Sequence, residues 1–147
     1  MTALAVTTAA AVLGLAGPAD AATPVVSFTR AQFDSPGTDN RTNASLNAEW
    51  VRLTNNTTKA IQLKGWTVRD TSNHVYTFPA ATVPAKRSMY LHTGKGKAST
   101  DSAGGHLYWG SGDYIWNNTG DTAYLRNTAA KTIDTCTWKS GTKPVNC

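Results

Sequence analysis

The sequence is short of acidic residues, and glutamate is almost absent from it. Glu49 is the only glutamate among 147 residues, and eight aspartates complete the acids. Glycoside hydrolysis by a carboxylate pair needs two acids across a cleft, whereas these aspartates lie mostly in turn-like segments. The motifs G-x-S-x-G and H-E-x-x-H are also missing, and His74, His92 and His106 lie in no nucleophile motif. We therefore expect no catalytic residues and a protein that is not an enzyme.

Long hydrophobic runs are missing too. The uncharged apolar stretch at residues 4–17 is shorter than the roughly 20 residues that cross a bilayer. It is followed by a proline and by an Ala-x-Ala cleavage pattern at Ala19–Ala21, which is typical of a secretory signal, although Met1–Val6 lacks the usual Lys or Arg. We expect residues 1–21 to be a signal peptide cleaved near Ala21. The mature chain, residues 22–147, would be secreted and would contain no transmembrane segment.

Cysteine is scarce, because Cys136 and Cys147 are the only two. An even number in an exported chain favours a disulfide. The loop that it closes holds about ten residues, and the constraint on the unfolded chain contributes roughly 2–3 kcal/mol. The alternative, a metal site built on two thiolates, lacks an evident third ligand. We predict a disulfide that ties the C-terminal end to the last strand.

Helical periodicity is also missing after the N-terminal stretch. Short segments that alternate apolar and polar residues are separated by turn residues, which is typical of a β-sandwich or barrel. Residues 93–106, rich in Gly, Lys, Ser and Thr, are expected to be a mobile loop. A mature chain of 126 residues supplies one core, so we expect one all-β domain. It would have eight or nine strands, among them residues 25–33, 49–54, 61–63, 66–69, 75–78, 89–92, 121–126 and 131–138.

Two segments carry the landmarks of a known family. In Glu49–Asp70, an acid and an aromatic residue precede alternating apolar residues, an Asn turn and the pair Gly65-Trp66. In Asn118–Asp134, an Asn-x-Gly-Asp hairpin start precedes a leucine and an apolar-Asp pair. The chain resembles the lamin tail domain in these segments, and the resemblance covers about residues 24–138. It implies an immunoglobulin-like β-sandwich of the secreted bacterial type and partners such as DNA, chromatin or proteins.

Elementary chemistry gives several of these landmarks a structural role. Gly65 permits a bulge or bend that turns the Trp66 indole into the core. Gly120 permits a positive φ at the start of the hairpin. Asp121 can accept backbone N–H bonds from that turn, and Asp70 can do the same after its strand. We expect these residues to stabilise the fold rather than to bind a ligand.

The mature chain is basic, and this is the first indication of a partner. Its 14 Lys and Arg against eight Asp and Glu give a net charge of +6, which favours anionic partners such as nucleic acid or acidic cell-wall polymers. Simple solubility is the plainer explanation. Lys86, Arg87, Lys95 and Lys97 flank the predicted strand at residues 89–92. We predict that these four bind the phosphates of a polyanion, DNA or a wall polymer, and a merely solvated loop is the alternative.

An aromatic segment offers a second kind of site. Trp109, Tyr114 and Trp116 lie among glycines, and exposed rings of this kind stack on sugars or bases. The alternative is that the two tryptophans pack into the end of the sandwich. The sequence thus leaves three functions open. We favour a non-catalytic polyanion-binding module over a carbohydrate-binding module and over a protein–protein adaptor with a purely structural role.

A metal site has little support in the sequence. Asp113, Asp121 and Asp134 would share a Ca²⁺ only if the fold brought them together, and their spacing is not that of an EF-hand. We expect neither a metal nor a cofactor.

Overall fold

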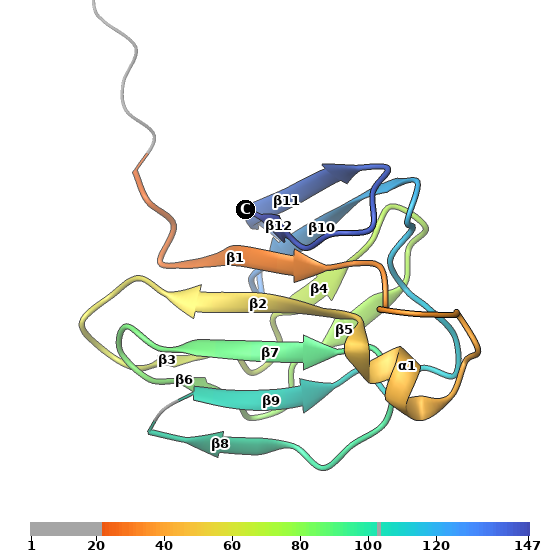
Figure 1. Ribbon diagram of the computed structural model, residues 1–147. Coiled ribbons are helices and arrows are strands. Elements are labelled where there is room, and N and C mark those ends of the chain that lie inside the picture. Colours follow the sequence, from red (N-terminus) through yellow and green to blue (C-terminus); the bar gives the residue numbers. More distant parts are fainter. Residues whose placement is uncertain (1–21, 103) are drawn as a thin grey trace, which may run out of the picture.

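The computed structural model describes residues 22–102 and 104–147, which form two sheets packed face to face (Figure 1). The predicted signal peptide lies outside the described residues. Within them, the one helix, α1, is six residues long, so no described helix is long and apolar enough to cross a membrane. The arrangement confirms the predicted all-β sandwich of the immunoglobulin type.

The larger sheet has six strands in the order β12-β1-β2-β7-β9-β8. Strands β7 and β9 are parallel, and the other neighbours are antiparallel. A third sheet has two strands of two residues each, β3 (Ile61–Gln62) and β6 (Thr82–Val83), and lies separately. The six strands are β12 (Val145–Asn146), β1 (Val26–Gln32), β2 (Trp50–Asn55), β7 (Ser88–His92), β9 (Gly104–Tyr108) and β8 (Ser99–Asp101).

The smaller sheet has four antiparallel strands in the order β11-β10-β4-β5. Its strands are β11 (Thr132–Lys139), β10 (Gly120–Arg126), β4 (Thr67–Arg69) and β5 (Val75–Thr77). The described residues therefore form twelve strands, more than the eight or nine predicted. Three of the additional strands contain only two or three residues, too few for alternation to be recognised.

The core lies between the two sheets and is built by alternation along each strand. In β2, Val51 and Leu53 are fully buried while their neighbours are half-buried, and β7 repeats this pattern at Met89 and Leu91. Burying a side chain of this size contributes roughly 1.5–3 kcal/mol. The largest fully buried side chains include Phe33, Phe78, Leu53, Leu63, Leu107 and Leu125.

The Gly65-Trp66 landmark is a tight turn between β3 and β4. The Trp66 amide donates to the Leu63 carbonyl at 2.9 Å, and Gly65 has φ of +79°, as the third residue of a type II turn requires. The predicted bend is therefore present. The indole packs against the core but stays half-buried, so the prediction that Trp66 turns into the core is correct only in part.

The segment at residues 93–106 is not the loop that its composition predicted. It contains β8 and the first half of β9, which meet as an antiparallel pair. Gly105 allows this pairing, because a Cβ there would lie 2.5 Å from the Ser99 carbonyl oxygen of β8. Gly104 allows the close approach of β7, because a Cβ there would lie 2.1 Å from the Ser88 carbonyl oxygen. The glycines therefore serve close strand packing at this edge rather than loop mobility.

The predicted disulfide is present between Cys136 of β11 and Cys147 at the end of the described chain. It lies next to the short pairing of β12 with β1, in which Asn146 faces Arg30. The bond therefore connects the last strand of one sheet to the edge of the other.

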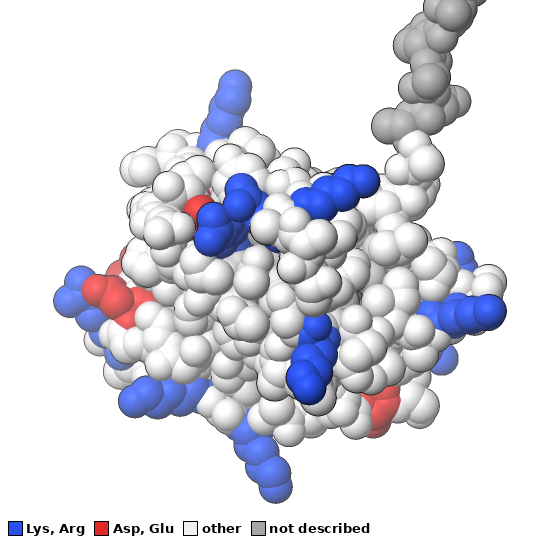
Figure 2. Space-filling model, turned by 180° about the vertical axis from the view of Figure 1, so that it is seen from behind, with Lys and Arg blue, Asp and Glu red and all other residues white. Residues whose placement is uncertain are grey.

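Seen from behind, Lys and Arg side chains are spread over the surface, with few Asp and Glu among them (Figure 2).

Candidate functional site

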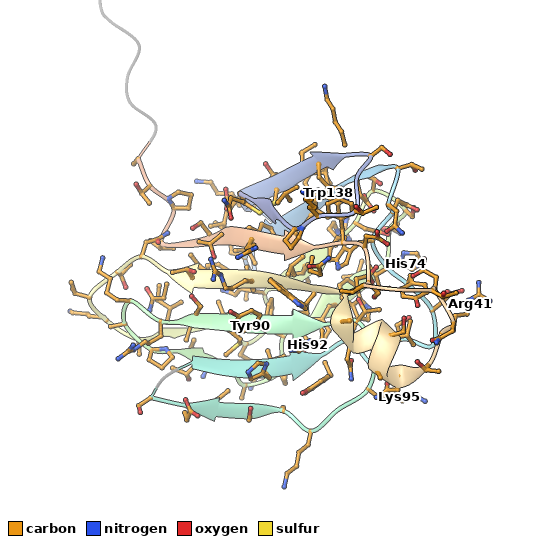
Figure 3. The ribbon with its side chains drawn as sticks, in the orientation of Figure 1. Arg41, His74, Tyr90, His92, Lys95 and Trp138 are labelled. Atoms are coloured by element: carbon orange, nitrogen blue, oxygen red, sulfur yellow. A yellow bond between two sulfur atoms is a disulfide. The ribbon has the colours of Figure 1, made fainter. Side chains whose placement is uncertain are left out.

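The outer face of the six-stranded sheet carries five rings, which we call the ring face: Trp50, Tyr90, His92, His106 and Tyr108. Register places them together. Directly opposite pairs are Trp50 with His92, Tyr90 with His106, and His92 with Tyr108. Paired residues share a face of the sheet, and the residues between them point into the core. Figure 3 shows Tyr90 and His92 on this face of β7.

The rings of this face touch one another across three strands. Tyr90 and His106 have ring centroids 5.2 Å apart with planes 11° apart, and His92 and Tyr108 have centroids 5.1 Å apart with planes 20° apart. Trp50 meets Tyr90 edge-on at 5.1 Å. His106 is exposed and the other four rings are half-buried. The result is a continuous aromatic surface in contact with solvent.

Hydrogen bonds fix the tautomers of the two histidines. His92 Nδ1 lies 2.8 Å from the carbonyl oxygen of Asn47, and a carbonyl only accepts, so this nitrogen carries a proton. Its Nε2 lies 2.9 Å from Nδ1 of His106, which therefore donates to it when both rings are neutral. Desolvation by burial and the charge of His106 lower the pKa of His92, against the opposing effect of the Asn47 carbonyl. Burial thus favours the neutral form of His92.

Helix α1 (Asn43–Ala48) holds the end of this face. Thr42 caps the start of the helix, and its hydroxyl accepts a hydrogen bond from the Ser45 amide at 3.3 Å. Both Asn43 and Asn47 donate their side-chain amides to the Lys95 carbonyl at 2.8 Å. The helix thus fixes the segment after β7 and, through Asn47, the orientation of His92.

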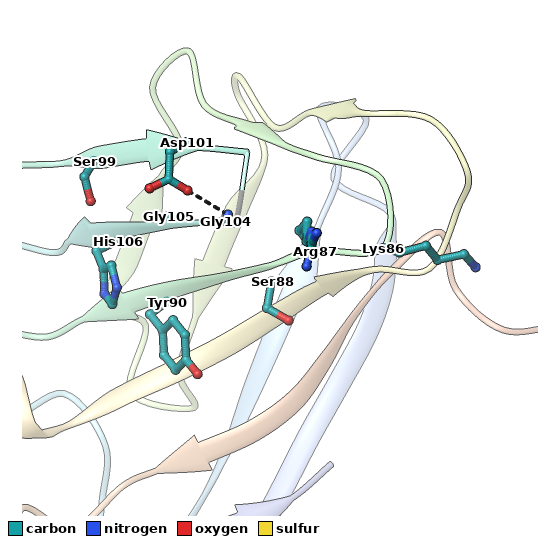
Figure 4. A pocket seen from close by; sticks show the side chains of 9 residues that line it. All are labelled: Lys86, Arg87, Ser88, Tyr90, Ser99, Asp101, Gly104, Gly105 and His106. Carbon is teal, nitrogen blue, oxygen red and sulfur yellow. Dashed lines mark hydrogen bonds between the residues drawn. The ribbon is translucent and has the colours of Figure 1, made fainter.

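A pocket of about 330 Å³ opens on the ring face between β7, β9 and β8 (Figure 4). Tyr90, His106 and Ser99 lie in one cross-strand row and line the pocket, and Gly104 and Gly105 line it without side chains. Arg87 lines it near the start of β7, and Asp101 receives the Gly104 amide at 3.1 Å. The pocket combines ring faces, hydroxyl groups and a guanidinium.

Positive charge lies in the same row as two of the rings. Arg30 faces Arg52, Arg52 faces Tyr90, Tyr90 faces His106, and we call this series the central row. The Arg52 Nε donates to the Thr29 hydroxyl at 2.9 Å, which orients its guanidinium. Among the described residues of the six strands, Asp101 on the outermost strand is the only acid. The sheet therefore presents cations and rings with little competing negative charge.

A match to a protein-family model identifies the kind of domain that carries the ring face. Residues 19–140 match the model of the Lamin Tail Domain. The chain belongs to the lamin tail domain family. No curated protein matches the chain. The match includes both landmark segments and confirms the resemblance predicted from them.

This lamin tail domain does not bring its four predicted cations together. Lys86 and Arg87 precede β7, and Lys95 and Lys97 follow it at the opposite end of the strand. Lys86 and Arg87 both line the pocket (Figure 4), and the Lys86 amine donates to the Asn56 carbonyl. Lys95 lies beside α1 (Figure 3). The four residues therefore do not form one patch, because the length of β7 separates the two pairs, and their binding of phosphates stays a prediction.

The predicted aromatic platform is also wrong in this lamin tail domain. Trp116 is 3% exposed and meets Trp109 edge-on at 5.9 Å and Trp138 at 5.5 Å. Trp109 also contacts Tyr76, and the Tyr114 hydroxyl lies 2.6 Å from that of Ser45. Both tryptophans pack at the end of the sandwich, which is the alternative that the sequence left open.

The three aspartates considered for a metal have separate partners. Asp113 pairs with Arg41 at 3.0 Å, and Asp134 accepts the Phe28 amide at 2.7 Å. Asp121 accepts the amides of Asn117 and Thr71 at 3.1 and 3.2 Å, which confirms its predicted structural role. Within residues 22–102 and 104–147, no three His, Cys, Asp or Glu side chains are grouped to hold a metal ion.

The ring face was missed because β9 was not recognised as a strand. Tyr90 and His92 are two residues apart, as are His106 and Tyr108. Spacing of two places side chains on one face of a strand. The signal was present in both segments, but assigning residues 93–106 to a loop removed His106 from the sheet.

Proposed function

We propose that this lamin tail domain is a non-catalytic module that binds single-stranded nucleic acid on its ring face. The observation that carries the proposal is the central row, in which Arg30 and Arg52 are followed in register by Tyr90 and His106. A single strand offers phosphates and unstacked bases side by side. Guanidinium groups match the first and exposed rings match the second.

The balance of cations and rings favours nucleic acid over other anionic polymers. Phosphate contacts alone would give salt-sensitive affinity for any polyanion, including a cell-wall polymer. Base stacking on an aromatic side chain adds about 1–3 kcal/mol per base, and only a ligand with planar rings gains it. The half-buried Tyr90 and the exposed His106, whose centroids lie 5.2 Å apart, would supply this second contribution.

We also propose that the module acts outside the cytosol. The Cys136–Cys147 bond supports this, because structural disulfides persist in oxidising compartments. The uncharged stretch at residues 4–17, followed by an Ala-x-Ala pattern, is the sequence feature that favours export. Detection of the protein, cleaved after Ala21, in the culture medium of an expressing cell would support export. Retention of the intact chain in the cytosol would contradict it.

The experiment is a fluorescence-anisotropy titration of labelled oligothymidylate at several NaCl concentrations between about 50 and 200 mM. Arg52→Gln should weaken binding and reduce the salt slope by about one, because one phosphate contact is lost. His106→Ala should weaken binding by about 1–3 kcal/mol and leave the slope nearly unchanged. Lys139→Gln, on the other sheet, is the matched control for charge and should change the affinity little.

Polyphosphate of similar length separates the two anionic classes. Oligothymidylate should bind more tightly than polyphosphate, and His106→Ala should remove most of that difference. Equal binding of both polymers, insensitive to His106→Ala, would instead indicate a ring-independent polyanion site. Absence of binding to oligothymidylate even at low salt would overturn the proposal.

A further inference from the structure

A second pair of arginines lies on the opposite side of the molecule, on the outer face of the four-stranded sheet. Arg69 of β4 faces Tyr124 of β10 directly, and Arg126 lies two residues further along β10. The Arg126 guanidinium carbon is 5.9 Å from the centre of the Tyr124 ring. The three side chains therefore form a cluster, which we call the Arg–Tyr–Arg cluster, on two adjacent strands.

Both guanidinium groups of this cluster are only partly satisfied. The Nε atoms of Arg69 and Arg126 are buried, and neither has a hydrogen-bond partner among the described residues. Neither arginine belongs to an ion pair in the described part of the chain. A buried donor without an acceptor costs about as much as a lost hydrogen bond, more when it is charged. Two such donors on neighbouring strands indicate a missing anionic acceptor.

The acids near the cluster are already engaged. Asp70 accepts the His74 amide at 2.7 Å, and its second oxygen lies 2.6 Å from Nδ1 of His74. Asp121 accepts a hydrogen bond from the Thr71 hydroxyl at 2.6 Å, and Asp134 accepts one from the Phe28 amide of the other sheet. None of these carboxylates bonds to either arginine among the described contacts. The positive potential of the pair is therefore available to a ligand.

A pocket of about 260 Å³ adjoins the cluster. It is smaller than the roughly 300–1,000 Å³ of pockets that enclose a whole small molecule, so it suits an anionic group rather than a complete ligand. The Thr71 and Asn73 positions contribute small polar side chains. Residues lining the pocket are Arg69, Asp70, Thr71, Asn73, Tyr124 and Arg126.

We propose that the Arg–Tyr–Arg cluster binds a tetrahedral oxyanion, the phosphate or sulfate group of a monoester. Guanidinium groups offer paired N–H donors whose spacing matches the oxygens of such a group. Tyr124 supplies a hydroxyl and a ring against which an aryl or sugar carrier can lie. This site is on the other sheet from the ring face and does not depend on nucleic-acid binding there.

The test observes the arginine Nε–H signals of the full chain by ¹H–¹⁵N NMR during titration with inorganic phosphate and, separately, sulfate. Ionic strength is held constant with NaCl, so that general screening does not contribute. The signals of Arg69 and Arg126 should shift and saturate together. The signal of Arg41, outside both proposed sites, should move little.

Variants then assign the site. Arg69→Gln should weaken the saturable shift at Arg126 about tenfold or more, because a charge-assisted contact is lost. Arg41→Gln, at an exposed arginine outside both proposed sites, is the control and should leave the shift unchanged. Saturation by either anion supports the site, and the ratio of the two affinities identifies a phosphate or a sulfate ester. Small, parallel, unsaturated shifts of all arginines would overturn the proposal from the wild-type data alone.

Discussion

The Nε2 of His92 and the Nδ1 of His106 lie 2.9 Å apart, at hydrogen-bond distance, at the centre of the ring face. The Nδ1–H of His92 already donates to the Asn47 carbonyl. Protonating both rings would therefore place the Nε2–H of His92 against the Nδ1–H of His106. Desolvation and this neighbour account for the lowered pKa of His92.

The pH titration of His92 should have its midpoint below the ordinary value of 6.5. Because the unfolded chain binds this proton more readily, the folded domain should lose stability as pH falls from about 6.5 through the folded-state pKa. His106→Asn removes the neighbouring charge and should raise the midpoint of His92 without restoring it fully, because the desolvation remains. NMR of the imidazole C–H signals measures the midpoint of His92 in the wild type and in the variant. A wild-type His92 midpoint above 6.5 would contradict this expectation.

Glu49 gives the domain a pH dependence of the opposite sense. Its side chain is 1% exposed, and its Oε1 accepts the Thr93 hydroxyl at 2.5 Å and the Ile115 amide at 2.9 Å. Burial raises its pKa from 4.5 to about 7, an effect only partly offset by these hydrogen bonds. The folded state therefore holds the proton more tightly than the unfolded chain, and stability should fall by about 3 kcal/mol as pH rises from below 4.5 to above 7.

Glu49→Gln tests that expectation, because glutamine keeps the shape and cannot ionise. Urea denaturation at pH 5 and at pH 8 should show a smaller loss of stability for this variant than for the wild type. His74→Gln, at an exposed histidine, provides a control for changes unrelated to Glu49. A wild type whose stability is unchanged or higher at pH 8 would show that Glu49 is not the dominant titrating group.

Trp116→Ala should cost about 3–5 kcal/mol of unfolding free energy. The indole is almost fully buried between Trp109 and Trp138, so its removal leaves a cavity at the end of the sandwich. Tyr114→Phe, which removes only the hydroxyl next to Ser45, should cost about 1 kcal/mol. Chemical denaturation of both variants measures the difference. A cost near 1 kcal/mol for Trp116→Ala would mean that this ring is not part of the core.

Replacing both Cys136 and Cys147 by serine should lower stability by about 2–3 kcal/mol, as expected for a loop of this length. The pairing of Asn146 with Arg30 should then fray, because only two residues of β12 bond to β1. Hydrogen exchange of the β12 amides reports the fraying and thermal unfolding reports the stability. Unchanged exchange at Asn146 would show that the short strand holds without the bond.

Much of the fold could be predicted because its long strands alternate cleanly. In β2 and β10 every second residue is buried, and these strands coincide with predicted ones. The disulfide followed from two cysteines alone. Strands of two or three residues, such as β6 and β8, depend on tertiary pairing and not on any local pattern. Helix α1 was missed for a similar reason, since six residues with Leu46 alone buried leave no periodicity.

The candidate site was harder to predict than the fold, because it depends on register. Lys86 and Lys95 are close in sequence, yet a strand running between them separates them in space. Arg52 and Tyr90 are 38 positions apart, yet they face each other across β2 and β7. Composition located the cations and the rings, but only the pairing of strands decides which of them meet.

The most direct test of the central claim is the footprint of a bound single strand on the folded domain. Backbone amide signals of the uniformly ¹⁵N-labelled full chain would be followed during titration with a short oligothymidylate at low salt. The account predicts that the largest shifts lie in β2, β7 and β9, around Arg52, Tyr90 and His106. Shifts confined to the four-stranded sheet or to the loop at Lys95 and Lys97 would contradict it.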